Sequence, residues 1–249
     1  MFAGSYCGSP PALADIATRW NGDLLPIVIL GSALALALKT GNRLAAGGVA
    51  LLALAFVSPL CAASVALFSA RSVHHLVLIL AALVFAMAMD RQAEGRMRLP
   101  VVPGTIVMTA VLWAWHIPAL YDAALANMLV YWLMQATILG SSIAFWMAIR
   151  RAGAVGAVGG LLGAMVQMGM LGALLTFAPE PLYIMHALAA PSWRLSGLAD
   201  QQLAGLIMWV GGMAPFAIGA IVIARHGWQN QAGSLAPDCN ARSAPRTAQ

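Results

Sequence analysis

The sequence predicts an all-α membrane protein: a polytopic bundle of about seven transmembrane helices, with its N-terminus outside and its C-terminus in the cytoplasm. Two observations predict the bundle. Of the 249 residues, 61% are hydrophobic and only 8% are charged, and the mean hydropathy is +0.84. Soluble domains carry about 25% charged residues. A third observation, the uneven distribution of basic residues between the loops, predicts the orientation.

Seven apolar segments divide residues 24–225 into one transmembrane bundle. A helical span needs about 20 apolar residues, and the first segment reaches that length only with residues 20–23 at the interface. The predicted spans are Leu24–Leu38, Leu44–Leu67, Val73–Met89, Val101–Ile117, Met128–Ile149, Val155–Phe177 and Leu203–Ala224. Residues 1–23 form an outer segment that lacks the apolar core of a signal peptide. Residues 226–249, rich in Ala, Ser, Pro and Asn, indicate a disordered cytoplasmic tail.

Local sequence signals mark the helix ends and the packing faces. The fourth span ends before Pro118, because the residue before a proline is disfavoured in helical conformation. Asp200 is a good N-cap for the seventh span. Glycines spaced four or seven apart let another helix come close. They are Gly156, Gly159, Gly160 and Gly163 in the sixth span, and Gly205 and Gly212 in the seventh.

The basic residues are divided ten to three between the two sides of the predicted bundle. One side holds Lys39, Arg43, Arg91, Arg96, Arg98, Arg150, Arg151, Arg225, Arg242 and Arg246, and the other holds Arg19, Arg71 and Arg194. The richer side is cytoplasmic by the positive-inside rule. The membrane therefore explains the net charge of +5 better than a nucleic-acid partner does.

Most of the reactive side chains fall at the outer ends of the predicted spans. They are His74, His75, His116, His186, Asp122, Glu180 and Asp200, with Gln201 and Gln202 beside the last. Ionisable residues at membrane depth are costly, so they are a functional hypothesis by default. Aromatic residues at the same level predict an interfacial belt: Trp113, Trp115, Tyr121, Tyr131, Trp132, Tyr183 and Trp193.

Imidazole and methionine thioether are ligands that suit copper, and the four outer histidines are the candidates. The spacing is nevertheless not a metal signature, because the sequence has no HxxxH or HExxH motif. Each histidine can equally be an interfacial residue that hydrogen-bonds to backbone or water. The three cysteines include no CxxC motif, and whether Cys7 and Cys61 pair on the oxidising side stays open.

Two other classes of function are compatible with the composition. A small transporter or permease for a metal ion or other solute would need polar residues through the membrane midplane, where the spans offer little beyond Gln135 and Gln167. An interfacial enzyme could use His116, Asp122 and Asp200 for acid–base chemistry. No nucleophile motif or carboxylate pair accompanies them, and we expect no enzyme.

Three stretches of the chain carry a family resemblance. They are LWAWHIPALYDAAL from Leu112, LGALLTFAPEPLY from Leu171 and LADQQLAGLIMWVGG from Leu198. With weaker echoes elsewhere, they cover most of residues 44–225. The chain resembles the polytopic CtaG-type family of cytochrome c oxidase assembly proteins, and the third stretch is the most specific.

The resemblance implies an integral protein of the bacterial plasma (inner) membrane that helps to assemble the oxidase. Its partners would be oxidase subunits and the lipid bilayer, and its role would be to support copper insertion or maturation at the outer face. The matching positions are His75, Trp113, His116, Pro118, Tyr121, Asp122, Pro179, Tyr183, Asp200, Gln201, Gln202 and Trp209.

The chain departs from the family pattern at two histidine pairs that would be natural copper ligands. The family tends to carry HxxxH at the start of its third span, where this chain has Arg71 before His75. It also tends to carry a second pair at the start of its fifth span, where this chain has Tyr131 and Gln135.

Overall fold

The computed structural model describes residues 5–90 and 100–235, and within these ranges every regular element is helical. The all-α membrane fold class is therefore confirmed. The elements are η1 (Leu13–Thr18), α1 (Leu24–Lys39), α2 (Arg43–Phe56), α3 (Pro59–Ala66), α4 (Phe68–Asp90), α5 (Val101–Ala114), α6 (Pro118–Ala126), α7 (Met128–Arg151), α8 (Ala154–Phe177), α9 (Ile184–Ala189), η2 (Ala190–Trp193), α10 (Gly197–Leu206), the π-helical turn η3 (Ile207–Gly211) and α11 (Gly212–Leu235).

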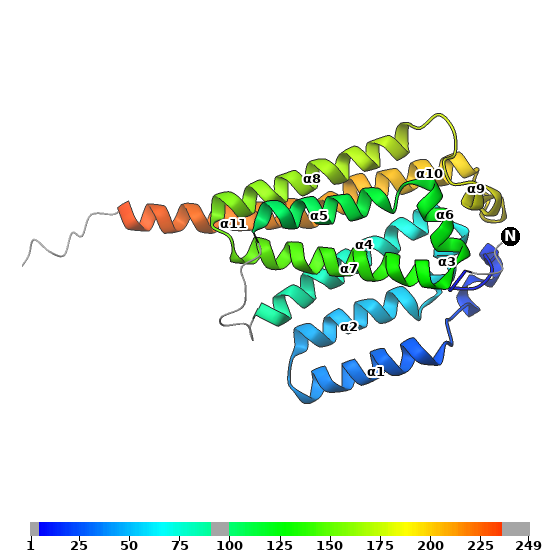
Figure 1. The fold of residues 1–249 in the computed structure, drawn as a ribbon, viewed down its shortest axis with the longest axis horizontal. Helices are drawn as coiled ribbons and strands as arrows, with labels where there is room; N and C mark the ends of the chain where they lie inside the picture. The colour runs from blue at the N-terminus through cyan, green and yellow to red at the C-terminus, as the bar shows by residue number, and fades with distance from the viewer. Residues whose placement is uncertain (1–4, 91–99, 236–249) are drawn as a thin grey trace, which may run out of the picture.

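The long helices run side by side in one bundle (Figure 1). In the described residues, 4 helices are long and apolar enough to cross a membrane, or up to 6 if each of two bent helix pairs counts as one span. Helix α1 is apolar but shorter, at 16 residues. Each of the seven expected segments thus has a helix, while the count of seven spans and their orientation stay predictions.

Two of the expected spans are bent near one end. The α2–α3 pair bends by 47°, where Ser58 caps the N-terminus of α3 and Pro59 occupies its first turn. The α5–α6 pair bends by 73°, and α6 begins at Pro118. Proline is favoured in the first turn because its missing N–H is not needed there. The expected outer segment after His116 is therefore a helix that turns across the end of the bundle.

The seventh expected span is part of a longer helical run that begins at Gly197 rather than Leu203. Its N-cap is Ser196, whose hydroxyl accepts from the backbone N–H of Ala199, so the prediction that Asp200 caps this helix is wrong. The run continues to Leu235, beyond Ala224. The first ten residues of the expected disordered tail, 226–235, are thus helical, and residues 236–249 lie outside the described part.

Close helix packing depends on two glycines that face each other. A Cβ atom on Gly172 of α8 would lie 2.8 Å from the carbonyl oxygen of Gly205 in α10, and one on Gly205 would lie 2.6 Å from the carbonyl oxygen of Gly172. The predicted packing role of Gly205 is confirmed, and that of Gly212, which meets Met168 at 2.9 Å, is also confirmed. In contrast, a Cβ on Gly159 would meet nothing within 4 Å.

The short helices α3, α6 and α9 gather at the end of the bundle where the chain begins (Figure 1). We call this the cap end. A disulfide between Cys7 and Cys61, with their Cα atoms 5.5 Å apart, ties the N-terminal segment to α3. Disulfides persist in oxidising compartments, so this pairing agrees with an outer location for the cap end.

Candidate functional site at the cap end

Asp200 holds the start of a different helix from its own. Its side chain is fully buried. One carboxylate oxygen accepts from the backbone N–H of Phe68 at 2.6 Å, and the other accepts from the N–H of Ser69 at 3.1 Å and from its hydroxyl at 2.5 Å. These two residues begin α4, whose first N–H groups lack partners within the helix. Asp200 therefore caps α4 from α10, across 132 residues of sequence.

The ring of Phe68 is the centre of an aromatic group that we call the aromatic cap. Phe68 stacks on Tyr183 with ring centroids 4.0 Å apart, and it meets Tyr121 edge-on at 5.5 Å. The rings of His186 and His116 lie at 5.6 and 6.2 Å. Asp200 thus holds the backbone of Phe68. The side chain of Phe68 in turn contacts residues of α6, of α9 and of the end of α5.

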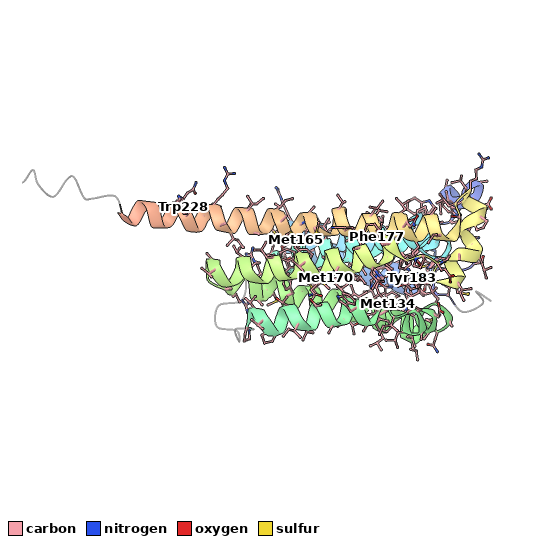
Figure 2. All side chains as sticks on the ribbon, turned by 90° about the horizontal axis from the view of Figure 1, so that it is seen from above. Met134, Met165, Met170, Phe177, Tyr183 and Trp228 are labelled. Atoms are coloured by element: carbon pink, nitrogen blue, oxygen red, sulfur yellow. A yellow bond between two sulfur atoms is a disulfide. The ribbon has the colours of Figure 1, made fainter. Side chains whose placement is uncertain are left out.

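Hydrogen bonds between side chains and backbone fix these rings in place. The hydroxyl of Tyr121 bonds to Nε2 of His186 at 2.6 Å. The hydroxyl of Tyr183 donates to the carbonyl oxygen of His116 at 2.7 Å, and Nδ1 of His116 bonds to the carbonyl oxygen of Leu112 at 2.6 Å. Figure 2 places Tyr183 near the cap end and Trp228 near the opposite end of the molecule.

The remaining residues of the predicted outer group contribute unequally. Gln201 is buried and fastens the α8–α9 loop, because its carbonyl oxygen accepts from the N–H of Leu182 at 2.6 Å and its amide donates to the carbonyl oxygen of Leu175 at 3.3 Å. Gln202, Trp113 and Asp122 are half-buried. They are not part of the aromatic contacts around Phe68.

A second buried group surrounds Arg71, which the sequence placed in an outer loop. That placement is wrong, because α4 begins at Phe68 and Arg71 is fully buried within it. Its Nε donates to the carbonyl oxygen of Ser64 at 3.1 Å, and its guanidinium carbon lies 5.5 Å from the ring centroid of Tyr131. His74 and His75 follow on the next turn of α4 with ring centroids 5.9 Å apart, and the ring of His75 is 6.2 Å from that of His116.

Burial controls the ionisation of the residues outside the spans. It lowers the pKa of His186 to about 3, with a smaller contribution from the positive charge of Arg71. It also raises the pKa of Tyr183 above its ordinary value. Both side chains are therefore neutral near pH 7, and the carboxylate of Asp200 lies at the edge of the aromatic cap.

The side chains of this end do not fit a resident copper ion. In the part of the chain that the structure describes, no three His, Cys, Asp or Glu side chains are arranged to hold a metal. One nitrogen of His116 and one of His186 already have protein partners. The buried guanidinium of Arg71 would repel a metal ion bound nearby. Two unit charges about 5 Å apart repel each other by about 3 kcal/mol at an effective dielectric constant of about 20.

The structure brings most of the predicted site residues together, but as two groups instead of one set of ligands. His116, His186, Tyr121 and Tyr183 form the aromatic cap around Phe68, with Asp200 at its edge, and His74 and His75 follow Arg71 in α4. The prediction of an interfacial aromatic belt is wrong for the three tyrosines named in it. Tyr121, Tyr131 and Tyr183 are each 2% exposed or less and pack in the core.

Phe68 and Arg71 were missed as partners of these residues. A phenylalanine in an apolar run has no distinguishing sequence signal. An arginine four residues before a histidine in a segment with few charges did offer one, since a charge within a span needs a buried partner.

The fold is that of a polytopic membrane protein. Its polar and aromatic groups lie buried at one end of a bundle of apolar helices. The family model of the cytochrome c oxidase caa3 assembly factor matches residues 86–230, which is more than half of the chain. The chain therefore belongs to this family. No curated protein and no solved structure matches it.

The matched region contains most of the aromatic cap but not all of the cap end. His116, Tyr121, Tyr183, His186 and Asp200 lie inside it. The matched region begins after Phe68, Arg71, His74 and His75. The structure, and not the family match, therefore shows where these four residues lie. Membership makes cytochrome c oxidase assembly the process in which the protein acts.

Proposed function

We propose that this protein supports maturation of cytochrome c oxidase from the outer face of the bacterial plasma membrane, by binding an oxidase subunit at the cap end. The observation that carries the proposal is that the family match includes three of the elements that build the aromatic cap, namely α6, α9 and α10. The protein has no turnover of its own in this proposal. Its partners are oxidase subunits and lipid.

Copper enters the proposal as cargo of the oxidase and not as a ligand held by this chain. The expected ligands His74, His75, His116 and His186 are committed to packing and hydrogen bonds or lie beside a fixed positive charge. Support for copper insertion would then consist in holding the oxidase subunit in a conformation that accepts the ion. This preserves the copper-related role that the family resemblance implies without requiring the missing histidine pairs.

The experiment replaces one residue at a time in a strain that depends on this chain for its oxidase. His75→Ala, His116→Ala and Asp122→Asn should each lower active oxidase in the membrane while the abundance of the assembly protein stays unchanged. His75 and His116 are buried, and truncation of a large buried side chain costs about 2–5 kcal/mol, so active oxidase is expressed per amount of assembly protein in the membrane. His226→Ala at the opposite end is the matched control. If all three variants leave oxidase activity and oxidase copper untouched, the cap end is not the working site.

The outer location needs a separate test. The division of basic residues between the loops predicts that a reporter fused after Arg225 is active only in the cytoplasm, and that one fused near Tyr121 is active only outside. An outside C-terminus would reverse the faces and remove the basis for placing the cap end beside the outer, copper-accepting part of the oxidase.

A transporter is a weaker alternative. It would require a polar path across the bundle, and Gln135, in the first half of α7, is 2% exposed and surrounded by apolar side chains of α1, α2 and α4.

A further inference from the structure

The guanidinium of Arg71 carries a permanent positive charge inside the protein. Arginine is not deprotonated in proteins, and this side chain is fully buried. Nε donates to the carbonyl oxygen of Ser64. The guanidinium also interacts with the hydroxyl groups of Tyr121 and Tyr131, and the face of Tyr131 supplies a cation–π contact.

The side chains around this charge are histidines and tyrosines. The charge of Arg71 acts on His74, His75 and His186. Nε2 of His75 has no hydrogen-bond partner among the described residues. The carboxylate of Asp200 accepts its hydrogen bonds from Phe68 and Ser69 at the start of α4.

Four buried positions on two packed helices define this group. Arg71 and His75 are four residues apart and share one face of α4, and Tyr131 and Gln135 share one face of α7 in the same way. Helices α4 and α7 pack together, and Arg71 lies over the ring of Tyr131. Four such positions on facing helices are an arrangement that can hold a metal when the residues are ligands. Here the space between the helices is taken by a guanidinium.

We propose that Arg71 is a built-in cation that completes the α4–α7 group, so that this group works without a metal ion and excludes one. The charge that a bound metal would supply comes from the chain itself, and the imidazole and phenol rings surround it. The group is then permanently in one state, independent of copper supply. This deepens the proposed function, because it assigns the cap end to protein contacts and not to metal transfer.

Metal affinity of the purified full-length protein in detergent tests the proposal directly. Wild type should bind neither Cu(I) nor Zn(II) stoichiometrically. Arg71→His with Tyr131→His replaces the cation by two ligands beside His75, and this variant should bind Cu(I) at least tenfold more tightly than wild type. Arg43→His, at an exposed site at the opposite end, is the control and should gain nothing. One equivalent of Cu(I) on wild type, lost in His75→Ala, would overturn the proposal. A folded double variant that gains no metal would also overturn it.

A charge series covers the case in which the double variant fails to fold. Arg71→Lys keeps the positive charge, and Arg71→Met keeps the length of the side chain without the charge. The melting temperature should fall further in Arg71→Met than in Arg71→Lys, because the histidine and tyrosine dipoles are arranged around a cation. Equal or greater stability of Arg71→Met would contradict the proposal. These readouts need no oxidase, so they succeed or fail separately from the assembly role.

Discussion

Replacing Asp200 by asparagine should loosen the start of α4 rather than the start of α10. The carboxylate is fully buried and accepts three hydrogen bonds from Phe68 and Ser69. Asparagine has the same shape but only one acceptor oxygen. If that oxygen keeps the bonds from Ser69, the amide group of asparagine faces the N–H of Phe68, donor against donor.

The magnitude follows from what is lost. A hydrogen bond to a charged acceptor contributes about 1.5–3 kcal/mol, and a buried N–H left without a partner costs about 1–3 kcal/mol. The interaction of a negative charge with the N-terminus of the 23-residue helix α4 adds up to about 2 kcal/mol in buried geometry. Because these contributions overlap, we expect Asp200→Asn to lower the free energy of unfolding by about 3–5 kcal/mol.

The assay is reversible unfolding of the purified protein in mixed micelles, with Ser196→Ala as the matched variant. Ser196 is the actual N-cap of α10, and loss of such a cap costs about 1 kcal/mol. Asp200→Asn should therefore be several-fold more destabilising than Ser196→Ala. A loss equal to or smaller than that of Ser196→Ala would refute the assignment of Asp200 to α4.

Three further predictions concern the bundle and its cap end. The Cys7–Cys61 bridge closes a separation of 54 residues, so Cys7→Ser should lower the free energy of unfolding by about 2–4 kcal/mol. Thermal melts of wild type with and without a thiol reductant should show the same difference. Gly172→Ala should destabilise the protein by about 1–3 kcal/mol in such melts, since its Cβ would lie 2.8 Å from a backbone oxygen, whereas Gly159→Ala should be neutral or stabilising. The pKa of His186 is lowered to about 3, so the unfolded chain takes up this proton first as pH falls. Stability should thus be complete above about pH 6.5 and decline toward pH 3 by at most about 1.4 kcal/mol per pH unit, and His186→Gln should flatten that decline.

The sequence predicted the helices well because their signals are local. Apolar segment length, proline and glycine positions placed α1, α7 and α8 to within two residues. The start of α4 was placed five residues late, because its cap is a carboxylate from α10 and no neighbouring residue announces it. Asp200 looked like a local N-cap for the same reason: the pattern of an acid before an apolar run is identical whether the acid caps its own helix or another.

The candidate site was predicted in composition but not in chemistry. The residues near His116 and His186 were expected on one face, and the fold does bring them together. What the sequence could not show is which ring nitrogens are already hydrogen-bonded and where the charge of Arg71 lies. Both depend on contacts between helices far apart in the chain. Because the sequence predicted the start of α4 at Val73 instead of Phe68, Arg71 was assigned to a solvated loop and not to the buried helix.

The most direct test of the central claim is the amount of assembled cytochrome c oxidase in membranes that lack this protein. Removal of the gene should lower the haem and copper content of the oxidase per unit of its largest subunit, and return of the wild-type chain should restore both. The oxidase subunit should also co-purify with the wild-type chain and be lost with His116→Ala while His226→Ala retains it. Fully assembled oxidase at normal level without this protein would contradict the assembly role.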